Sequence, residues 1–339
     1  MDVLVVGADD VWDLLPMAEC IAAMERALAA LSAGQAVMPL RSIMWLPGRV
    51  GALGTMPAFL PDAGVLGLKV ISVFPGNHGT PFDAHQGAVM LFEAAHGRPV
   101  ALVDATAITA IRTAATSAVA TRLLAREDAG DLALLGSGTQ ARTHLEAMRA
   151  VRRLRRVRVW SRTPEHADRF AATEGQRWGL AIEAVRSARE AVAGADLICT
   201  VTSARDPVLL GEWIAPGAHI NAVGSSVPFA RELDTAAVVR ARLYVDRRES
   251  ALHEAGDFLI PRQEGAVTDD HIRGELGEVL LGRAAGRSAP EEVTLFKSLG
   301  LAVEDLAAAH HVYRQALTAG RGARVELGGA RSADAAGAL

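Results

Sequence analysis

The sequence has little cysteine, no long hydrophobic run and no extended basic segment. Its two cysteines, Cys20 and Cys199, lie far apart in apolar surroundings, which argues against a disulfide framework and against a metal site. The formal net charge is −4, and the basic cluster at residues 152–156 ("RRLRR") is short. Nucleic acid is therefore not an expected partner.

The sequence also predicts no segment for membrane insertion or export. The longest apolar runs fall far short of the roughly 20 residues that a transmembrane helix needs. The stretch "MDVLVVGADD" carries no basic segment and reaches Asp9 and Asp10 too early for a signal peptide. Since 50% of the 339 residues are hydrophobic and 22% are charged, the composition is that of a soluble globular protein. We expect a cytoplasmic location and no membrane partner.

The first third of the chain predicts one helix followed by a sheet. Apolar residues recur at helical spacing between Pro16 and Gly34, which suit the first turn and the end of a helix. Residues 36–103 instead form short β-like runs separated by turns, which predicts a largely antiparallel or mixed sheet. These runs are "SIMWLP", "GALGTMPAF", "GLKVISVF", "GAVMLFE" and "PVALVD". An Ala- and Thr-rich helix is expected at 105–125.

From residue 130 onward, strand-like and helix-like segments alternate. This alternation predicts an α/β fold with a Rossmann-type doubly wound parallel sheet, beside an α+β domain formed by the earlier residues. We expect the α+β domain at 1–120, the nucleotide domain at 121–300, and a helix at 301–320 that rejoins the first domain. The tail at 321–339 has little to pack and is expected to be disordered.

A glycine-rich turn lies between the first strand and the first helix of the alternating region, in "LALLGSGTQARTHLEAM". Gly136 allows the tight turn, Gly138 lets a pyrophosphate approach the backbone, and Ala141 keeps the helix close to the sheet. The helix N-terminus then offers N–H groups to the phosphates. Such turns also occur as plain structural turns, but the strand–turn–helix context favours dinucleotide binding.

The end of the second strand indicates which dinucleotide binds. NAD enzymes tend to carry an acidic residue there for the ribose 2′-hydroxyl, whereas this chain has Ser161, Arg162 and Thr163. A guanidinium and two hydroxyls can bind a 2′-phosphate. We therefore expect NADPH, with NADH as an alternative and an ordinary surface arginine as the structural explanation.

Lys69 is the unexpected residue of "GLKVISVFPGN" (67–77), because its neighbours Leu68, Val70 and Ile71 suit a sheet interior. On an edge strand, the lysine could point into solvent while its neighbours point inward. This segment by itself leaves both an exposed lysine and a functional lysine open.

Several separated stretches together resemble the ornithine cyclodeaminase/mu-crystallin family, up to about residue 318. They are "MPLR", "GLKVISVFPGN", "ITAIRTAATSAVAT", "LGSGTQA", "VWSRTPEHADRFA", "GEWIAPGAHINAVGSS" with "RELD", and "TLFKSLGLAVEDLAAA". The resemblance implies a Rossmann domain and a substrate-binding domain that also forms a homodimer. It further implies that Arg41, Lys69 and Arg112 bind the carboxylate of a small imino or amino acid. Three neighbouring cations repel one another, and an anionic substrate relieves that repulsion.

The glycine turn, the strand ends and the resemblance together give the remaining site residues. On the substrate side these are Met56, His85 and Ser226, with Gln86 near the cofactor or substrate. On the cofactor side they are Arg112, Thr113, Gly136, Ser137, Gly138, Thr139, Gln140, Ala141, Ser161, Arg162, Thr163, Thr200, Val201, Thr202, Val223, Gly224, Lys297 and Leu299. Met56 and His85 have structural explanations too, as a core methionine and a loop histidine. Glu304 and Asp305 are expected to cap and anchor the last helix.

Two departures from the family pattern bear on the reaction. Cyclodeaminases of the family carry acidic residues where this chain has Gly54 and Ser226, and cyclodeamination needs such groups as a base and as an ammonium ligand. The motifs instead resemble the mu-crystallin branch, which implies an NADPH-dependent oxidoreductase that reduces a 2-imino acid or cyclic ketimine carboxylate. The alternatives are an ornithine cyclodeaminase-type ammonia lyase that recycles NAD, and a non-catalytic protein that retains NADPH.

Overall fold

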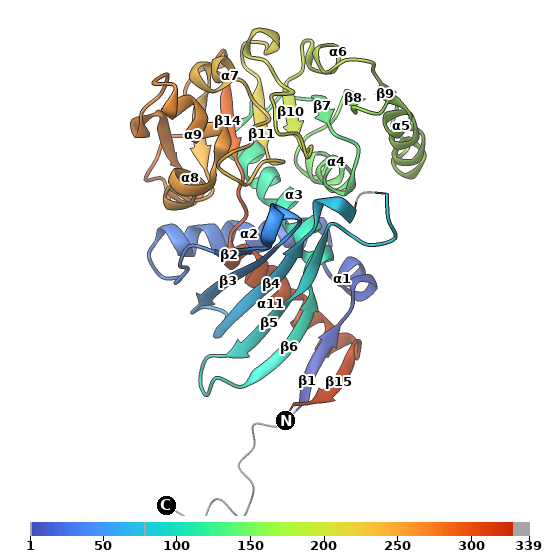
Figure 1. The fold of residues 1–339 in the computed structure, drawn as a ribbon, viewed down its shortest axis with the longest axis vertical. Helices are drawn as coiled ribbons and strands as arrows, with labels where there is room; N and C mark the ends of the chain where they lie inside the picture. Colours follow the sequence, from blue (N-terminus) through green and yellow to red (C-terminus); the bar gives the residue numbers. More distant parts are fainter. Residues whose placement is uncertain (1, 78, 328–339) are drawn as a thin grey trace, which may run out of the picture. The chain divides into compact units, whose positions relative to one another are not determined.

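Two sheets follow from the two patterns in the sequence, short strands before residue 104 and alternating strands and helices after 130. The computed structural model describes residues 2–77 and 79–327 (Figure 1). The described residues form two units, the first from 2–16, 34–109 and 302–327 and the second from 17–33 and 110–301. No helix in these described ranges is long and apolar enough to cross a membrane.

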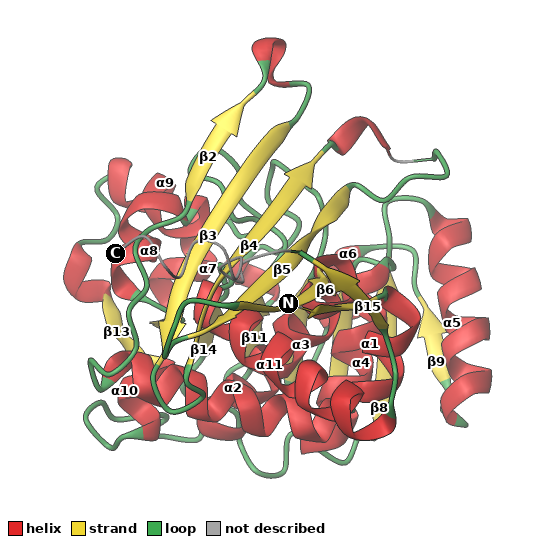
Figure 2. Ribbon diagram, turned by 90° about the horizontal axis from the view of Figure 1, so that it is seen from below, coloured by secondary structure: helices red, strands yellow, loops and turns green. Residues whose placement is uncertain are grey.

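The first unit is built on a seven-stranded sheet in the order β15-β1-β6-β5-β4-β3-β2 (Figure 2). β1 and β6 are parallel, and the other neighbours are antiparallel. The strands are β1 (Asp2–Val6), β2 (Ser42–Trp45), β3 (Ala52–Leu60), β4 (Val65–Val73), β5 (His85–Glu93), β6 (Pro99–Asp104) and β15 (Ala323–Glu326). The expected mixed sheet is confirmed.

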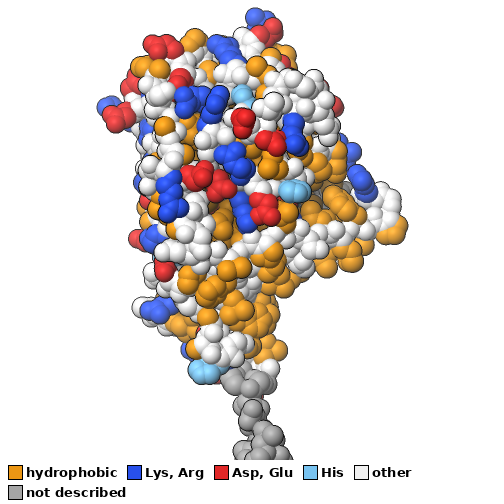
Figure 3. Space-filling view, turned by 90° about the vertical axis from the view of Figure 1, so that its left-hand side faces the viewer, with side chains coloured by type: hydrophobic (Ala, Val, Ile, Leu, Met, Phe, Trp, Pro, Cys, Tyr) orange, Lys and Arg blue, Asp and Glu red, His pale blue; other side chains and the backbone are white. Residues whose placement is uncertain are grey.

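One face of this sheet is covered by α11 (Ala302–Ala319), which packs across β3, β4 and β5. Side chains of β3 and β4 alternate between buried and more exposed, as a half-covered sheet requires. Gly67 is needed for this packing, because a Cβ there would lie 2.5 Å from the Met90 carbonyl oxygen and 3.3 Å from Leu306. On the other face, Leu53 and Leu66 are 36% and 38% exposed. Figure 3 shows hydrophobic side chains gathered on the surface of the first unit.

The second unit is an eight-stranded, all-parallel sheet in the order β13-β12-β14-β11-β10-β7-β8-β9. Chain order reverses between β7 and β10, which is the switch point at which doubly wound sheets bind dinucleotides. The strands are β7 (Asp131–Leu135), β8 (Arg156–Trp160), β9 (Ile182–Ala184), β10 (Leu197–Thr200), β11 (His219–Ala222), β12 (Arg242–Val245), β13 (Ile272–Glu275) and β14 (Thr294–Lys297).

Helices cover both faces of the second sheet. On one face, α6, α7, α8 and α9 share a hydrophobic core with β7, β10, β11, β12 and β14. On the other, α3 contacts β11 through a hydrogen bond from Asn221 to Thr121, and α2 packs on α4 and α10. The helices are α1 (Ala8–Leu14, first unit), α2 (Met17–Ser32), α3 (Ala105–Leu124), α4 (Thr139–Val151), α5 (Pro164–Trp178), α6 (Ala188–Val192), α7 (Thr235–Arg240), α8 (Arg248–Glu254), α9 (Gly256–Gln263) and α10 (Leu276–Leu280). The doubly wound fold is confirmed.

Two features differ from the sequence-based expectations, and the place of one strand was not foreseen. The division at residue 120 is not observed, because α2 and most of α3 pack within the second unit. The tail expected at 321–339 contributes β15, whose backbone pairs with β1 although all four of its residues are exposed; residues 328–339 lie outside the described residues. The segment "TLFK" forms β14, a central strand between β11 and β12.

At the amino ends of β7 and β10, the Asp196 carboxylate joins the two strands. Its Oδ2 accepts hydrogen bonds from the backbone N–H groups of Gly130 (2.9 Å) and Asp131 (3.1 Å), and Arg126 donates to Oδ1 at 2.7 Å. Burial opposes ionisation, but these hydrogen bonds outweigh it and hold the pKa of Asp196 below its ordinary value of 3.8. The ionised carboxylate therefore stabilises the folded state.

We expect Asp196→Asn to lower the free energy of unfolding by about 1–3 kcal/mol at neutral pH, because one of the backbone or arginine donors then faces an NH₂ group. A depressed pKa contributes stability above the unfolded value, and this contribution is lost as the pH falls through the folded value. The difference between wild type and variant should therefore be constant near neutral pH and shrink below about pH 4. Urea unfolding from pH 7 to pH 3 measures it, and a difference that grows on acidification would contradict the assignment.

Candidate active site

Lys69 lies on the covered face of the first sheet. β4 is an interior strand, and Lys69 is buried on it along with Gly67 and Ile71. Its Nζ donates to Thr109 Oγ1 at 2.7 Å and forms an ion pair with Asp305 Oδ1 at 3.0 Å, and the two charged side chains are 3% and 0% exposed. The edge-strand explanation of this lysine is wrong, because β4 is an interior strand and Lys69 is buried. A buried ammonium needs a counter-charge, which Asp305 provides.

Met56 and Arg41 belong to the same part of the first sheet. Met56 is the cross-strand partner of Lys69 in the β3–β4 register, and it is buried. Arg41 immediately precedes Ser42, whose partner on β3 is Thr55, the neighbour of Met56. Met56 and Lys69 are thus paired on β3 and β4, and Arg41 directly precedes β2, one residue before the position paired with Thr55.

His85 is farther along the sheet than these residues. It opens β5 and pairs with Val73, whereas the partner of Lys69 on β5 is Val89. The His85 side chain is exposed, and its carbonyl oxygen accepts a hydrogen bond from the Thr106 hydroxyl at 3.0 Å. Its proposed role beside the substrate stays a prediction.

In the second unit, the glycine turn has the geometry that a pyrophosphate needs. Gly136 has a φ of 119°, and a Cβ there would lie 2.7 Å from the Val201 carbonyl oxygen, so only glycine lets β7 end this close to β10. Gly138 precedes α4 as its N-cap and is exposed, and the described residues supply no side-chain cap at this helix end. Ala141, in the first turn of α4, is fully buried. The N-terminus of α4 thus has the backbone geometry that suits an anion.

The loop after β8 also fits its expected role. Ser161 and Thr163 are half-buried, and Arg162 between them is exposed. Thr163 is the N-cap of α5, and Pro164 opens that helix. Among the described residues, no carboxylate lies within ion-pair distance of Arg162. The guanidinium can therefore take a phosphate without first breaking an internal ion pair.

Arg112 on α3 is buried against the turn that follows β14. A Cβ at Gly300 would lie 2.5 Å from Arg112 Nη1, so the guanidinium packs directly on the glycine backbone. Asp246 Oδ2 holds this turn by accepting from the N–H groups of Leu299 (2.6 Å) and Gly300 (2.8 Å). Thr113, the next residue on α3, is also buried. The Asp246 carboxylate thereby sets the backbone against which Arg112 is oriented.

The carboxyl ends of β10 and β11 carry the other predicted cofactor residues. Thr200 ends β10, Val201 and Thr202 follow that strand, and Val223 and Gly224 follow β11. The buried Glu232 carboxylate accepts hydrogen bonds from Thr200 Oγ1, Thr202 N, Thr202 Oγ1 and Gly224 N at 2.6–2.7 Å. Ser226, farther along the same loop, is half-buried.

Lys297 differs from a ligand-facing lysine. Its Nζ lies 3.0 Å from Asp257 Oδ2 and donates to the Ala222 carbonyl oxygen at 3.1 Å, and both charged side chains are buried. The ammonium therefore joins β14 to β11 and α9. A direct contact of Lys297 with a cofactor stays a prediction.

Sequence reasoning missed the carboxylates that hold these residues. Asp305 was expected to anchor its helix, but it is also the ion-pair partner of Lys69, and Glu232 and Asp246 had no assigned role. Asp305 could have been suspected from a carboxylate in an Ala- and Leu-rich helix. Glu232 lies in the "RELD" stretch, but neither its role nor that of Asp246 has a local signal, because the groups that donate to these carboxylates belong to other loops and strand ends.

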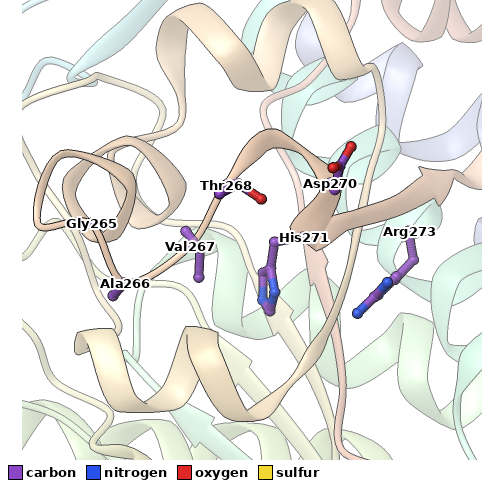
Figure 4. Close-up of a pocket in the computed structure, with 7 residues that line it drawn as sticks. All are labelled: Gly265, Ala266, Val267, Thr268, Asp270, His271 and Arg273. Atoms are coloured by element: carbon purple, nitrogen blue, oxygen red, sulfur yellow. The ribbon is translucent and has the colours of Figure 1, made fainter.

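A separate pocket lies in the segment that joins α9 to β13, at residues 265–273 (Figure 4). β13 is the edge strand of the second sheet, on the far side of β12, β14, β11 and β10 from the glycine turn of β7. The His271 ring there lies 2.8 Å from the Val238 carbonyl oxygen. This pocket is therefore distinct from the predicted dinucleotide site.

Known proteins are similar to this chain in both sequence and fold. The model of the ornithine cyclodeaminase/mu-crystallin family matches residues 1–320. A mouse (Mus musculus) ketimine reductase mu-crystallin is 42% identical over 313 residues, which cover 91% of this chain and 96% of that protein.

Two solved structures are similar throughout. The Thermococcus litoralis Delta(1)-pyrroline-2-carboxylate reductase, in complex with NADH and L-proline, has a TM-score of 0.93 at 40% identity and covers 95% of this chain and 100% of its own. An archaeal alanine dehydrogenase dimer with bound NAD has a TM-score of 0.91 at 32% identity, covering 96% and 99%. A match along nearly the whole length, together with the dinucleotide turn and the buried lysine, shows that the chain belongs to the ornithine cyclodeaminase/mu-crystallin family.

Proposed function

We propose that the protein is an NADPH-dependent reductase that converts a small 2-imino acid or a cyclic ketimine carboxylate into the amino acid. The observation that carries this proposal is the Lys69 ammonium, buried at an interior strand beside Thr109 and Asp305 in a chain that also holds a dinucleotide turn. A cation kept out of water at the expense of desolvation is suited to bind an anion or to transfer a proton. The similarity to ketimine and pyrroline-carboxylate reductases supports the same chemistry.

The residues present also favour reduction over cyclodeamination. Gly54 on β3 has no side chain to act as a base, and Ser226 has no carboxylate to hold the distal ammonium of a diamino acid. Incubation with ornithine and catalytic NAD should therefore yield no proline. Release of ammonia and proline would favour the lyase instead.

The proposed mechanism combines a bound cofactor with three cationic side chains. When bound, NADPH supplies a hydride to the imine carbon. Arg41, Lys69 and Arg112 are proposed to bind the substrate carboxylate with charge-assisted hydrogen bonds. Asp305 keeps the Lys69 ammonium in one place and offsets its charge. A proton must reach the substrate nitrogen to complete the amine, and Lys69 or a water held by it is the proposed donor.

Substituting Lys69 by Met should lower turnover with an imino acid by ~100-fold or more, because a charge-assisted contact and the orientation it provides are lost. NADPH affinity should stay nearly unchanged, since the glycine turn and Arg162 belong to the second unit. An amide analogue of the substrate should react poorly with the wild type and lose less on mutation than the acid does. Additive losses across wild type and variant, with acid and amide, would mean that Lys69 does not contact the carboxylate.

This variant needs a control for stability. Removing one partner of a buried ion pair costs about 3–5 kcal/mol, because Asp305 then lacks its Lys69 counter-charge. The double variant Lys69→Met/Asp305→Asn removes both charges and should recover part of that stability. Its turnover should stay as low as that of Lys69→Met, which separates the lost contact from a folding defect.

We propose that NADPH binds more tightly than NADH, although two similar structures hold NADH and NAD. The basis is Arg162, exposed after β8 where a 2′-phosphate would lie. Each charge-assisted hydrogen bond to that phosphate contributes ~1.5–3 kcal/mol. Arg162→Asp should abolish or reverse the preference in titrations with both cofactors. Equal dissociation constants for NADPH and NADH in the wild type would exclude this role of Arg162.

We also propose that the protein forms a homodimer through the uncovered face and β2 end of the first sheet. Ile43, Met44, Trp45 and Val50 are 38%, 58%, 43% and 62% exposed, which is unusual for a patch of large apolar side chains. Light scattering should give about twice the 35.6 kDa of one chain, and Met44→Glu should shift the mass toward one chain. A stable monomer with full activity would refute the proposal.

A further inference from the structure

A single buried carboxylate joins the carboxyl ends of β10 and β11. Glu232 is fully buried, and its Oε1 accepts from the backbone N–H of Thr202 at 2.7 Å and from the Thr202 hydroxyl at 2.6 Å. Its Oε2 accepts from the backbone N–H of Gly224 at 2.7 Å and from the Thr200 hydroxyl at 2.7 Å. Each oxygen thus serves one backbone donor and one hydroxyl, and each backbone donor belongs to the loop after a different strand.

The loops after β10 and β11 pack closely against each other and against Glu232. A Cβ at Gly224 would lie 2.1 Å from the Thr202 carbonyl oxygen and 2.5 Å from Glu232 Oε1. On the other side, the glycine turn touches the same segment, since a Cβ at Gly136 would lie 2.7 Å from the Val201 carbonyl oxygen. The ends of β7, β10 and β11 therefore form one continuous backbone surface. Glu232 is hydrogen-bonded to the loops that follow β10 and β11.

Glu232 is itself held in place by a second buried carboxylate. Asp257 Oδ1 accepts from the backbone N–H groups of Glu232 (2.8 Å) and Leu233 (3.0 Å). The Lys297 ammonium lies 3.0 Å from Asp257 Oδ2. Burial, together with the nearby Asp257 charge, raises the pKa of Glu232, and the hydrogen bonds from Thr202 and Thr200 oppose this. Two carboxylates are thus buried to hold one loop. Burying each of them carries a desolvation penalty that a plain turn does not need.

We infer that Glu232 is a positioning residue for the nicotinamide half of the dinucleotide. The inference rests on the proposed function only in that a dinucleotide binds at this switch point. The pyrophosphate belongs at the glycine turn after β7 and the adenosine end at the loop after β8, so the other half extends toward β10 and β11. Glu232 is buried and acts through the backbone N–H groups of Thr202 and Gly224, because its carboxylate fixes their relative positions.

The substitution Glu232→Gln tests this role with the smallest change of shape. A glutamine keeps one acceptor oxygen and turns the other into an NH₂ donor. The hydroxyl next to the NH₂ group can rotate and accept from it, but a backbone N–H cannot. Either Thr202 or Gly224 must then face a donor, and its loop has to move.

The experiment compares two ligands that differ in the nicotinamide half. NADPH carries it, and adenosine 2′,5′-bisphosphate does not. By calorimetric titration of the full chain, we expect Glu232→Gln to weaken NADPH about tenfold and to change adenosine 2′,5′-bisphosphate less than twofold. NADH and ADP serve as the corresponding pair if the protein takes NADH. Because no imine is present, the result is independent of which substrate the enzyme reduces.

Asp196→Asn is the matched control. Asp196 also accepts two backbone N–H groups, but at the amino ends of β7 and β10. This variant should lower stability while leaving the affinity ratio of the two ligands at the wild-type value. An equal loss for both ligands with Glu232→Gln, or no loss for NADPH, would overturn the inference.

A second variant covers the case in which Glu232→Gln does not fold. Thr200→Val removes one hydroxyl donor to Glu232 Oε2 and leaves every backbone donor in place. It should weaken NADPH by a smaller factor, about threefold, again without affecting adenosine 2′,5′-bisphosphate. An unchanged ratio in a folded Thr200→Val protein would contradict the role of the network.

Discussion

The ion pair between Lys69 and Asp305 joins an interior strand of the first sheet to the helix that covers it. Both charges are buried, so each would carry a large desolvation penalty without the other. α11 reaches this position from the end of the chain, more than 230 residues after β4. The first unit is therefore closed by a contact that also fixes the proposed substrate-binding ammonium. Met56 on β3 is the cross-strand partner of Lys69 on β4.

The second unit uses carboxylates in a similar way at both ends of its strands. Asp196 joins the amino ends of β7 and β10, while Glu232 and Asp246 hold loops at the carboxyl ends. Backbone N–H groups that leave a sheet need acceptors, and an ionised carboxylate satisfies two at once. Glycines at 136, 224 and 300 then permit contacts that a Cβ would prevent. Close backbone packing, held by buried acids, forms the surface proposed to receive a dinucleotide.

Most of the fold could be predicted from local patterns. The strands of residues 42–104, the helix from residue 105 and the glycine turn all lie where periodicity and turn residues indicate. The site was predicted less completely. Three residues stand out locally. Lys69 conflicts with its apolar neighbours, Gly136 is required by the tight turn, and Arg162 stands where an acidic residue is usual. Glu232, Asp246 and the pairing of Asp305 with Lys69 do not stand out, because each depends on a partner distant in sequence.

The sequence by itself determined which segments are strands and helices, the presence of a phosphate-binding turn, and the absence of an acid after β8. These properties depend on backbone preferences and side-chain spacing within a few residues. Only the tertiary structure decided that β14 enters the sheet between β11 and β12, that β15 pairs with β1, and that Lys69 faces α11. Strand order and the burial of a charge depend on which distant surfaces can exclude water together, and no local pattern records that.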